Sequence, residues 1–175
     1  MKFNPSTVQT RWESPLGEMC LAASPIGLAG VWFVNQQHLP DHLAGPSAWT
    51  HQDTNPVLPQ AIDQLTEYFA GRRKAFDLPL DLDGGSSFQQ SVWRALSTIP
   101  YGASYSYSDI SRQIGNPKAV RAVGSAVGRN PISLIVPCHR VLGRDGSLTG
   151  YAGGLDRKTA LLALEDVAFK AQPPQ

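Results

Sequence analysis

The sequence has 175 residues, which is enough for one or two small domains with a hydrophobic core. Hydrophobic residues make up 42% of the chain and charged residues 17%, as in globular proteins and unlike disordered ones. No apolar run approaches the ~20 residues of a membrane-spanning helix. The N-terminus also lacks the apolar segment of a signal peptide. We therefore expect a cytoplasmic protein that does not bind membranes.

The N-terminal half alternates between extended segments and turns. Three segments have the composition and alternation of strands and are separated by turns rich in Pro and Gly, which predicts an antiparallel meander. They occupy residues 7–12, 19–23 and 28–34. Residues 35–55 are polar and predict a loop. Residues 56–70 carry apolar side chains at helical spacing and predict a helix that ends at Gly71, with a short extended piece at 78–83.

The charge of the chain changes sign near its middle. The net charge is +1, but residues 1–85 hold five basic and nine acidic residues, whereas residues 86–175 hold ten basic and five acidic residues. The basic half is where a polyanion such as DNA would bind. The change of sign coincides with a polar, glycine-rich segment, which is typical of a domain boundary.

We therefore predict an α+β protein of two domains. A supporting domain with a small antiparallel sheet and one helix spans residues 1–83, and a linker spans 84–87. A mainly helical domain spans 88–170 and is followed by a tail at 171–175.

The second domain is predicted to contain four helices and one strand. The helices are expected at residues 88–99, from Ser106 or Tyr107 to Gln113, at residues 117–127 and at residues 156–169. Ser87 is the expected N-cap of the first helix, and Pro117 is expected at the first position of the third. The middle two are joined by Ile114-Gly115-Asn116-Pro117. This pair is either a helix-turn-helix, with a winged-helix-like domain around it, or a plain helical hairpin.

The second helix of this pair is unusually slim. Small residues lie on nearly all of its faces: Ala119, Ala122, Gly124, Ser125, Ala126 and Gly128. Such a helix is a poor core element but can approach another backbone closely. It could enter even the minor groove of DNA, which is about 6 Å wide.

The chemistry of the chain centres on Cys138, which follows a short apolar run and Pro137. Residues 134–136 predict a buried strand that the proline ends. The next residue, His139, could accept the thiol proton and create a nucleophilic thiolate. Neighbouring residues on a strand point to opposite faces, so the pair needs either a turn or a bridging water. The alternative is an inert, buried cysteine beside a surface histidine.

The run Ile135-Val136-Pro137-Cys138-His139-Arg140 resembles the active-site signature of the O6-alkylguanine-DNA alkyltransferases. The resemblance covers residues 88–165 closely and the earlier region more loosely. It implies direct reversal of DNA damage, in which the alkyl group of O6-alkylguanine moves irreversibly to Cys138, with O4-alkylthymine as a further candidate substrate. Each molecule would act once and use no cofactor.

The resemblance also implies roles for other residues of the signature region. His139 would take the proton of Cys138 through a water, Glu165 would hold the imidazole, and Asn130 would brace the turn around the thiol. Tyr107 would donate a proton to the leaving guanine, and Lys158 would lie near its O6.

DNA and the extruded base would be bound by a second group of residues. The resemblance places the slim helix in the minor groove of double-stranded DNA, where Arg121 fills the gap left by the flipped base. The loop around Gly153 would line the substrate pocket. The residues assigned to DNA or substrate are Arg121, Ala122, Gly124, Ser125, Arg140, Tyr151, Ala152 and Gly153. The protein is expected to be a monomer that binds DNA either singly or cooperatively.

Three other functions compete with this interpretation. A cysteine hydrolase could use Cys138, His139 and Glu165, although its histidine normally comes from elsewhere in the chain. A damage-binding protein of related sequence would lack the cysteine, and a sequence-specific regulator would carry Asn, Gln and Arg on its recognition helix. No metal site is predicted, because Cys20, His38, His42 and His51 are too dispersed to ligate zinc.

Overall fold

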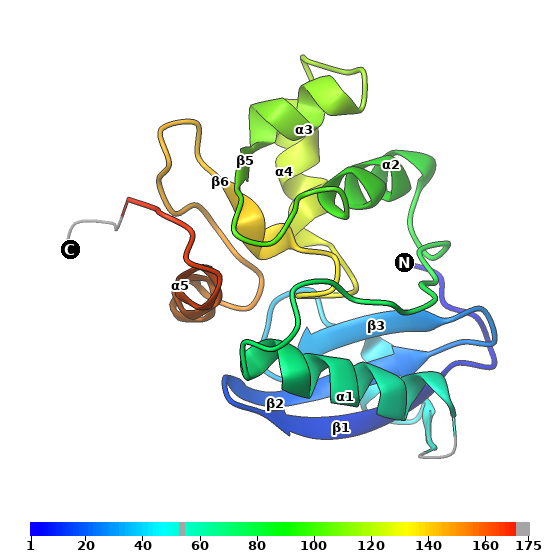
Figure 1. The fold of residues 1–175 in the computed structure, drawn as a ribbon. Helices are drawn as coiled ribbons and strands as arrows, with labels where there is room; N and C mark the ends of the chain where they lie inside the picture. Colours follow the sequence, from blue (N-terminus) through cyan, green and yellow to red (C-terminus); the bar gives the residue numbers. More distant parts are fainter. Residues whose placement is uncertain (53–54, 171–175) are drawn as a thin grey trace. The chain divides into compact units, whose positions relative to one another are not determined.

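The computed structural model describes residues 1–52 and 55–170 and divides into two compact units (Figure 1). The first unit contains Met1–Ser86 together with Pro131–Ser133, and the second contains Ser87–Asn130 and the chain from Leu134 onward. The expected linker at 84–87 lies at this division. The return of residues 131–133 to the first unit was not expected from the sequence, and the expected tail at 171–175 lies outside the described residues.

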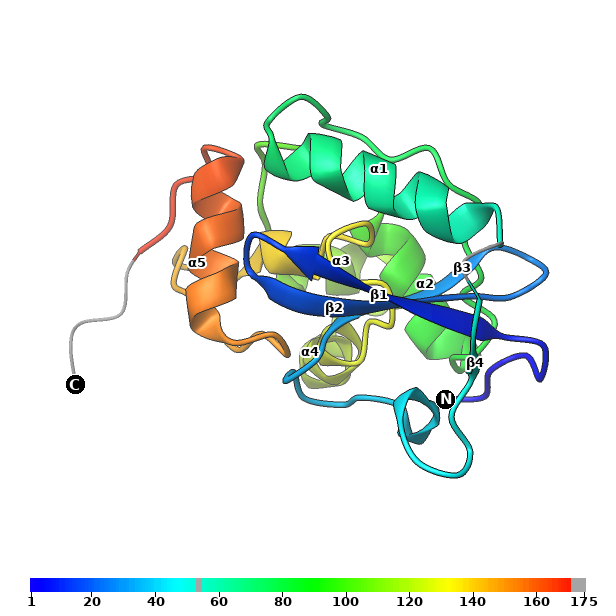
Figure 2. The same ribbon diagram turned by 90° about the horizontal axis from the view of Figure 1, so that it is seen from below.

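The first unit is a four-stranded sheet covered by one helix. Strands β1 (Val8–Ser14), β2 (Gly17–Ala23) and β3 (Leu28–Phe33) form the predicted antiparallel meander. Strand β4 (Thr50–His51) adds to β1 in parallel and gives the order β3-β2-β1-β4, and a 3₁₀ helix (Asp41–Leu43) precedes it. Helix α1 (Val57–Phe69) lies across the sheet (Figure 2).

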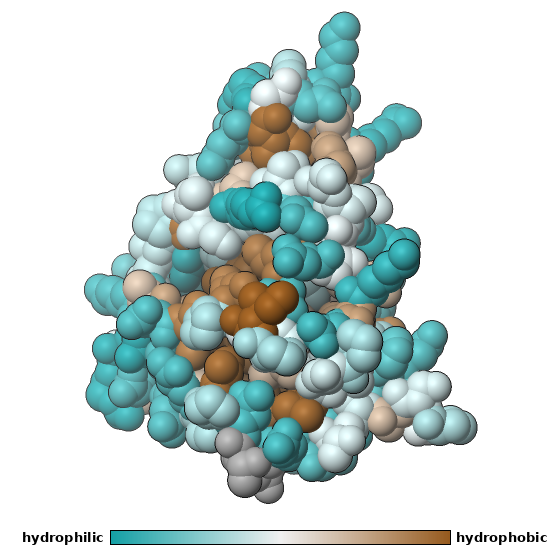
Figure 3. Space-filling view, turned by 90° about the vertical axis from the view of Figure 1, so that its right-hand side faces the viewer, coloured by the Kyte–Doolittle hydropathy of each residue, from teal (hydrophilic) through white to brown (hydrophobic). Residues whose placement is uncertain are grey.

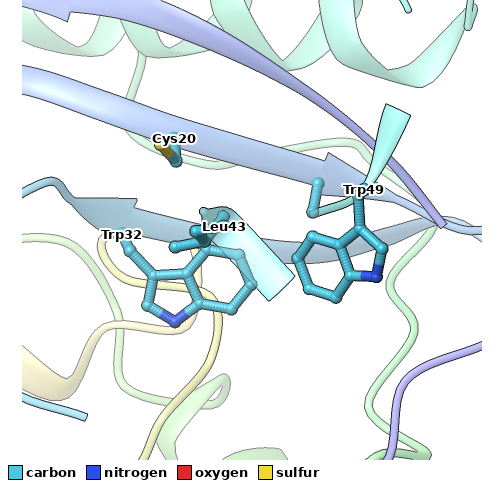
Figure 4. Close-up of a cluster of buried hydrophobic side chains, with 5 residues drawn as sticks. Cys20, Trp32, Leu43 and Trp49 are labelled. Atoms are coloured by element: carbon cyan, nitrogen blue, oxygen red, sulfur yellow. The ribbon is translucent and has the colours of Figure 1, made fainter. Parts of the chain in front are cut away.

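A hydrophobic cluster fills part of this unit and draws residues from the expected loop. Cys20 and Trp32 come from neighbouring strands, while Leu43 and Trp49 come from the segment before β4 (Figure 4). A Cβ atom on Gly30 would lie 1.7 Å from the Trp32 ring, so this position requires glycine. Apolar side chains thus explain why a segment of polar composition is packed on the sheet.

Hydrophobic side chains also reach the surface. Brown, hydrophobic atoms gather near the middle of the face shown in Figure 3. Among the described residues, Met1 and Ile26 are the large hydrophobic ones that are exposed, and both line a hollow of the first unit together with Phe3 and Leu82. Over residues 1–52 and 55–170, no helix has the length and apolar character needed to cross a membrane.

The second unit contains four helices and a short two-stranded sheet. Helices α2 (Ser87–Leu96), α3 (Tyr107–Gln113) and α4 (Val120–Gly128) pack together, and α5 (Leu155–Leu164) follows the nucleophile region. Strands β5 (Tyr105–Ser106) and β6 (Val141–Leu142) pair in parallel. The Trp93 indole donates a hydrogen bond to the carbonyl of Ala126 at 2.8 Å, which fixes α2 against α4.

Helices α3 and α4 form the predicted pair joined by a tight turn. Ser106 caps α3 in a reciprocal capping box with Asp109, as its position before the helix indicates. Gly115 has a φ of 74° in the turn, a conformation that glycine adopts without strain. The predicted start of α4 was wrong: residues 116–119 form a turn, and the helix begins at Val120.

The predicted strand at residues 134–136 was also wrong. Leu134 has a φ of 69°, and the chain turns through this region instead of extending. The backbone pairs with strand β3 earlier in the chain, at residues 131–133. There the N–H of Val31 donates to the carbonyl of Pro131, and the N–H of Ser133 donates to the carbonyl of Val31. Residues 134–136 are apolar because they are buried, not because they form a strand.

Candidate active site

Cys138 is the first residue of a short 3₁₀ helix (Cys138–Arg140) immediately after Pro137, and only 4% of its surface is exposed to solvent. The N–H of Cys138 donates to the carbonyl of Val136 at 2.8 Å, which closes a tight turn around the proline. The side-chain amide of Asn130 donates to that same carbonyl at 2.7 Å and to Cys138 Sγ at 3.1 Å. Asn130 therefore has the geometry of the expected brace and also solvates the sulfur.

His139 and Arg140 share one carboxylate, that of Glu165. His139 Nε2 lies 2.8 Å from Glu165 Oε1. The Arg140 guanidinium donates to both carboxylate oxygens, at 2.7 and 2.9 Å, and to the carbonyl of Ile99 at 2.6 Å. All three side chains are buried, so the Arg140 charge compensates that of Glu165 in a site shielded from water.

Glu165 reaches this position because α5 ends one residue before it. The sequence predicted a helix continuing to residue 169, but the helix stops at Leu164 and Asp166 has a φ of 57°. Glu165 is thus the C-cap residue, and its side chain is held in the interior by two neighbours from the nucleophile turn.

Burial opposes ionisation of both catalytic candidates. It raises the pKa of the Cys138 thiol, against the opposing effects of the Asn130 hydrogen bond and the Lys158 charge. It lowers the pKa of His139, against the raising effect of the Glu165 carboxylate. The polar neighbours therefore act against burial, which remains the larger effect on the pKa of each group.

Lys158 is fully buried, and its ammonium donates to two main-chain carbonyls. The acceptors are Val141, at 2.6 Å, and Thr149, at 3.1 Å. Burial lowers the pKa of Lys158 to about 8, and interaction with Cys138 partly opposes this shift. The structure thus places a buried cation within electrostatic range of the Cys138 thiol.

Tyr107 lies at the first position of α3, where the Thr149 hydroxyl donates a hydrogen bond to its phenol oxygen at 3.0 Å. Burial raises the pKa of Tyr107. Its ring is also close to α4, because a Cβ atom on Gly124 would lie 3.8 Å from it. Tyr107 therefore links the helix pair to the loop that follows β6.

The remaining predicted residues divide into a loop and a helix face. In the loop, Gly153 is buried, Tyr151 and Ala152 are partly buried, and the Gly153 carbonyl accepts a hydrogen bond from Arg157. On α4, Arg121, Ala122 and Ser125 are exposed. The structure thus gathers the thiol, imidazole, carboxylate, amide and ammonium groups, while the α4 residues form a separate surface.

Sequence reasoning grouped Arg140 with the residues that contact DNA, but its guanidinium is buried against Glu165. A useful signal was present, because a charge inside a buried apolar run requires a partner. Thr149 and Tyr101 were not singled out. Thr149 contacts Tyr107, and the Tyr101 hydroxyl donates to the carbonyl of Leu164 at 2.9 Å. Nothing in their local sequence indicates these long-range contacts.

Comparison with known proteins identifies the family through both units. Residues 8–82 match the ribonuclease-like domain of 6-O-methylguanine DNA methyltransferase, and residues 87–167 match its DNA-binding domain. The chain belongs to this family. The family predicted from the signature is confirmed, and methyl transfer replaces the cysteine-hydrolase alternative.

Relatives of this methyltransferase family cover most of the chain. The methylated-DNA–protein-cysteine methyltransferase of Mycolicibacterium paratuberculosis is 51% identical over 87% of this chain and 88% of its own length. The constitutive methylated-DNA–protein-cysteine methyltransferase of Bacillus subtilis is 46% identical over 92% of this chain and 96% of its own length. The crystal structure of Mycobacterium tuberculosis OGT in complex with DNA has a TM-score of 0.79 and 48% identity, covering 89% of this chain and 90% of that one. The predicted α+β fold class is confirmed by these structures.

Replacement of the buried ammonium by Lys158→Met should change how the methyltransferase's stability depends on pH. The folded-state pKa of Lys158 is about 8, whereas its ordinary value is 10.5. As pH rises, the folded protein loses this proton before the unfolded chain does, so the unfolded chain binds more protons. Relative to Lys158→Met, the wild-type free energy of unfolding should therefore rise by up to about 3 kcal/mol between about pH 7 and pH 10.

Urea unfolding of both proteins across this pH range measures the effect. The variant should also transfer alkyl groups more slowly, because the charge that lowers the pKa of Cys138 is removed. Parallel pH dependences for the two proteins would show that Lys158 keeps its ordinary pKa in the fold.

Proposed function

We propose that this protein removes the alkyl group from O6-alkylguanine in DNA by transferring it to Cys138 in one irreversible step. The carbon–O6 bond of the base breaks and a carbon–sulfur bond forms. The thiol proton is released to the protein, and the guanine leaving group gains a proton, so atoms and charge balance. The observation that carries this proposal is the contact set around Cys138, which combines Asn130, the nearby Lys158 charge and the His139–Glu165 pair.

His139 is the proposed acceptor of the thiol proton. Its Nε2 is occupied by Glu165, while Nδ1 is buried and makes no hydrogen bond to the described protein atoms. Nδ1 is therefore the nitrogen left to take the proton, with a water as the connecting group. Glu165 stabilises the imidazolium that results, and Arg140 keeps that carboxylate in place.

Tyr107 is the proposed donor to the leaving guanine. Because its oxygen accepts the hydrogen bond from Thr149, its own proton is available to the base. The raised pKa keeps the phenol protonated until the guanine anion develops. The loop at Tyr151, Ala152 and Gly153 would line the pocket, where the small side chain of Ala152 and the glycine allow close approach of the base.

The thioether product explains why each molecule should act once. Unlike a thioester, a thioether has no carbonyl for water to attack. The other cysteine, Cys20, is a free thiol buried in the hydrophobic cluster of the first unit. Titration of alkylated DNA with a known amount of protein should therefore reach a plateau at one repaired base per protein molecule, and continued repair beyond it would contradict single turnover.

The exposed face of α4 is the proposed DNA-binding surface, inserted in the minor groove. Val123, Ala126 and Val127 are buried, whereas five small or basic residues of the helix and its flanks are exposed. These exposed residues are Lys118, Arg121, Ala122, Ser125 and Arg129. Basic side chains bind phosphate and the small ones permit close approach, whereas the helix itself has no Asn or Gln to read base edges. We also propose that the protein acts as a monomer in the cytoplasm.

Arg121→Ala should selectively slow repair of duplex DNA. The target base must be flipped out of the helix, and the side chain that replaces it offsets part of the unstacking cost. We expect the rate on duplex DNA to fall by about tenfold or more, which corresponds to about 1.4 kcal/mol. The rate with free O6-alkylguanine base should stay near that of wild type, because a free base needs no extrusion.

The two substrates are to be compared on the same protein preparation. Arg129→Ala, a second exposed arginine at the end of α4, is the matched control for loss of one positive charge. An equal loss of both rates in Arg121→Ala would assign Arg121 to the fold or the pocket instead of base extrusion.

A further inference from the structure

The turn between α2 and β5 contacts Arg140, one partner of the Glu165 carboxylate, and the backbone of α5 just before Glu165. The Tyr101 hydroxyl donates to the carbonyl of Leu164 at 2.9 Å, one residue before Glu165. The face of the same ring lies against Arg140, with 5.9 Å between the guanidinium carbon and the ring centroid. The carbonyl of Ile99, two residues earlier, accepts the third Arg140 hydrogen bond at 2.6 Å.

These contacts act on the two elements that fix the carboxylate in space. The Leu164 carbonyl belongs to the last turn of α5, where carbonyl groups have no partner within the helix. Tyr101 supplies that partner and so restrains the peptide that leads into Glu165. The ring also restrains the flat guanidinium by a cation–π contact, while the Ile99 carbonyl fixes its rotation.

We propose that Tyr101 is a positioning residue that holds Glu165 in register with His139 and thereby sets the reactivity of Cys138. The inference rests on the proposed roles of Cys138, His139 and Glu165. Tyr101 reaches Glu165 indirectly, through the Leu164 carbonyl and the Arg140 guanidinium. Its effect follows from geometry, because a catalytic constellation loses efficiency when its members shift by about 0.5 Å.

Tyr101→Phe isolates the hydroxyl and keeps the ring on Arg140. The rate of Cys138 alkylation by free O6-alkylguanine base should fall by about threefold to tenfold, the effect of one lost hydrogen bond. Tyr101→Leu removes the ring as well and should lower the rate further. Free base is used because the measurement then does not depend on DNA binding or base extrusion.

Tyr105→Phe is the matched control. Tyr105 lies four residues away in β5 and is also partly buried, and within the described part of the chain it has no hydrogen bond to α5. The Tyr105→Phe variant should react with free O6-alkylguanine base at the wild-type rate. Thermal unfolding of all variants, followed by circular dichroism, establishes the folded fraction at the assay temperature.

The decisive comparison repeats Tyr101→Phe in a His139→Gln background. Glutamine is uncharged like the neutral imidazole and cannot relay the proton, so His139→Gln alone should slow transfer. If Tyr101 acts through Glu165 and His139, Tyr101→Phe should then change the remaining rate by less than about twofold, because coupled residues are not additive. The loss in melting temperature from Tyr101→Phe should be the same in both backgrounds.

Each other outcome overturns a defined statement. If Tyr101→Phe transfers the alkyl group at the wild-type rate while His139→Gln is slow, Tyr101 has no positioning role, and the proposed function stays intact. Equal rate losses in both backgrounds would make Tyr101 a structural residue only. A wild-type rate for His139→Gln would overturn the proton relay itself and the inference that depends on it.

Discussion

Cys138→Ser is expected to abolish alkyl transfer and to leave affinity for duplex DNA within about twofold of wild type. The serine hydroxyl can still accept the Asn130 hydrogen bond, so the turn around the residue should persist. A hydroxyl is much harder to ionise than a thiol, and the nucleophile is lost. Transfer of a radiolabelled methyl group from DNA to protein, together with a DNA-binding titration, measures both properties.

Cys20→Ala is the control for the other thiol of the chain. Cys20 lies in one hydrophobic cluster with Trp32 and Trp49 (Figure 4). Burial raises the pKa of its thiol. Its replacement should lower thermal stability by leaving a small cavity but should keep transfer at one alkyl group per molecule. Residual transfer in Cys138→Ser, or its loss in Cys20→Ala, would reassign the acceptor.

Glu165→Gln is expected to slow transfer by about tenfold to hundredfold, or about 1.4 to 2.7 kcal/mol. The carboxylate that stabilises the His139 imidazolium would be gone, while an amide of equal size would remain. The variant should also lose about 3 kcal/mol of stability, because the buried Arg140 guanidinium loses its counter-charge.

Asp166→Asn provides a control for removal of one carboxylate at the end of α5, since Asp166 is exposed and follows Glu165 directly. It should retain both the wild-type rate and the wild-type melting temperature. Rates are to be measured at a temperature where circular dichroism shows every variant folded. If folded Glu165→Gln transfers alkyl groups at the wild-type rate, the carboxylate supports the fold and not the chemistry.

Local chemistry in the sequence predicted much of the fold. Alternating residues and turn signals located the meander, and the start of α3 was predicted at Ser106 or Tyr107, next to the observed N-cap and first helical residue. The same reasoning failed at residues 134–136. Apolar composition reports burial, and only the positive φ of Leu134, which no sequence rule indicates for leucine, shows that the chain turns there.

The candidate site was predicted unevenly for the same reason. Cys138, His139 and Glu165 were identified through a resemblance, and the structure places the imidazole and the carboxylate in contact. The ion pair of Arg140 with Glu165 joins residues 25 positions apart. The hydrogen bond from Tyr101 to Leu164 spans 63 positions. Contacts of this range depend on the packing of complete helices, so neighbouring residues carry no signal for them.

Intact-protein mass spectrometry after reaction with DNA that contains O6-methylguanine tests the central proposal most directly. Each protein molecule should gain the mass of one methyl group in place of one hydrogen, and peptide mapping should place that group on Cys138 alone. The modified protein should stay modified and inactive when fresh alkylated DNA is added. An unchanged protein mass while the DNA loses its methyl groups, or a methyl group found on another residue, would contradict the proposed transfer to Cys138.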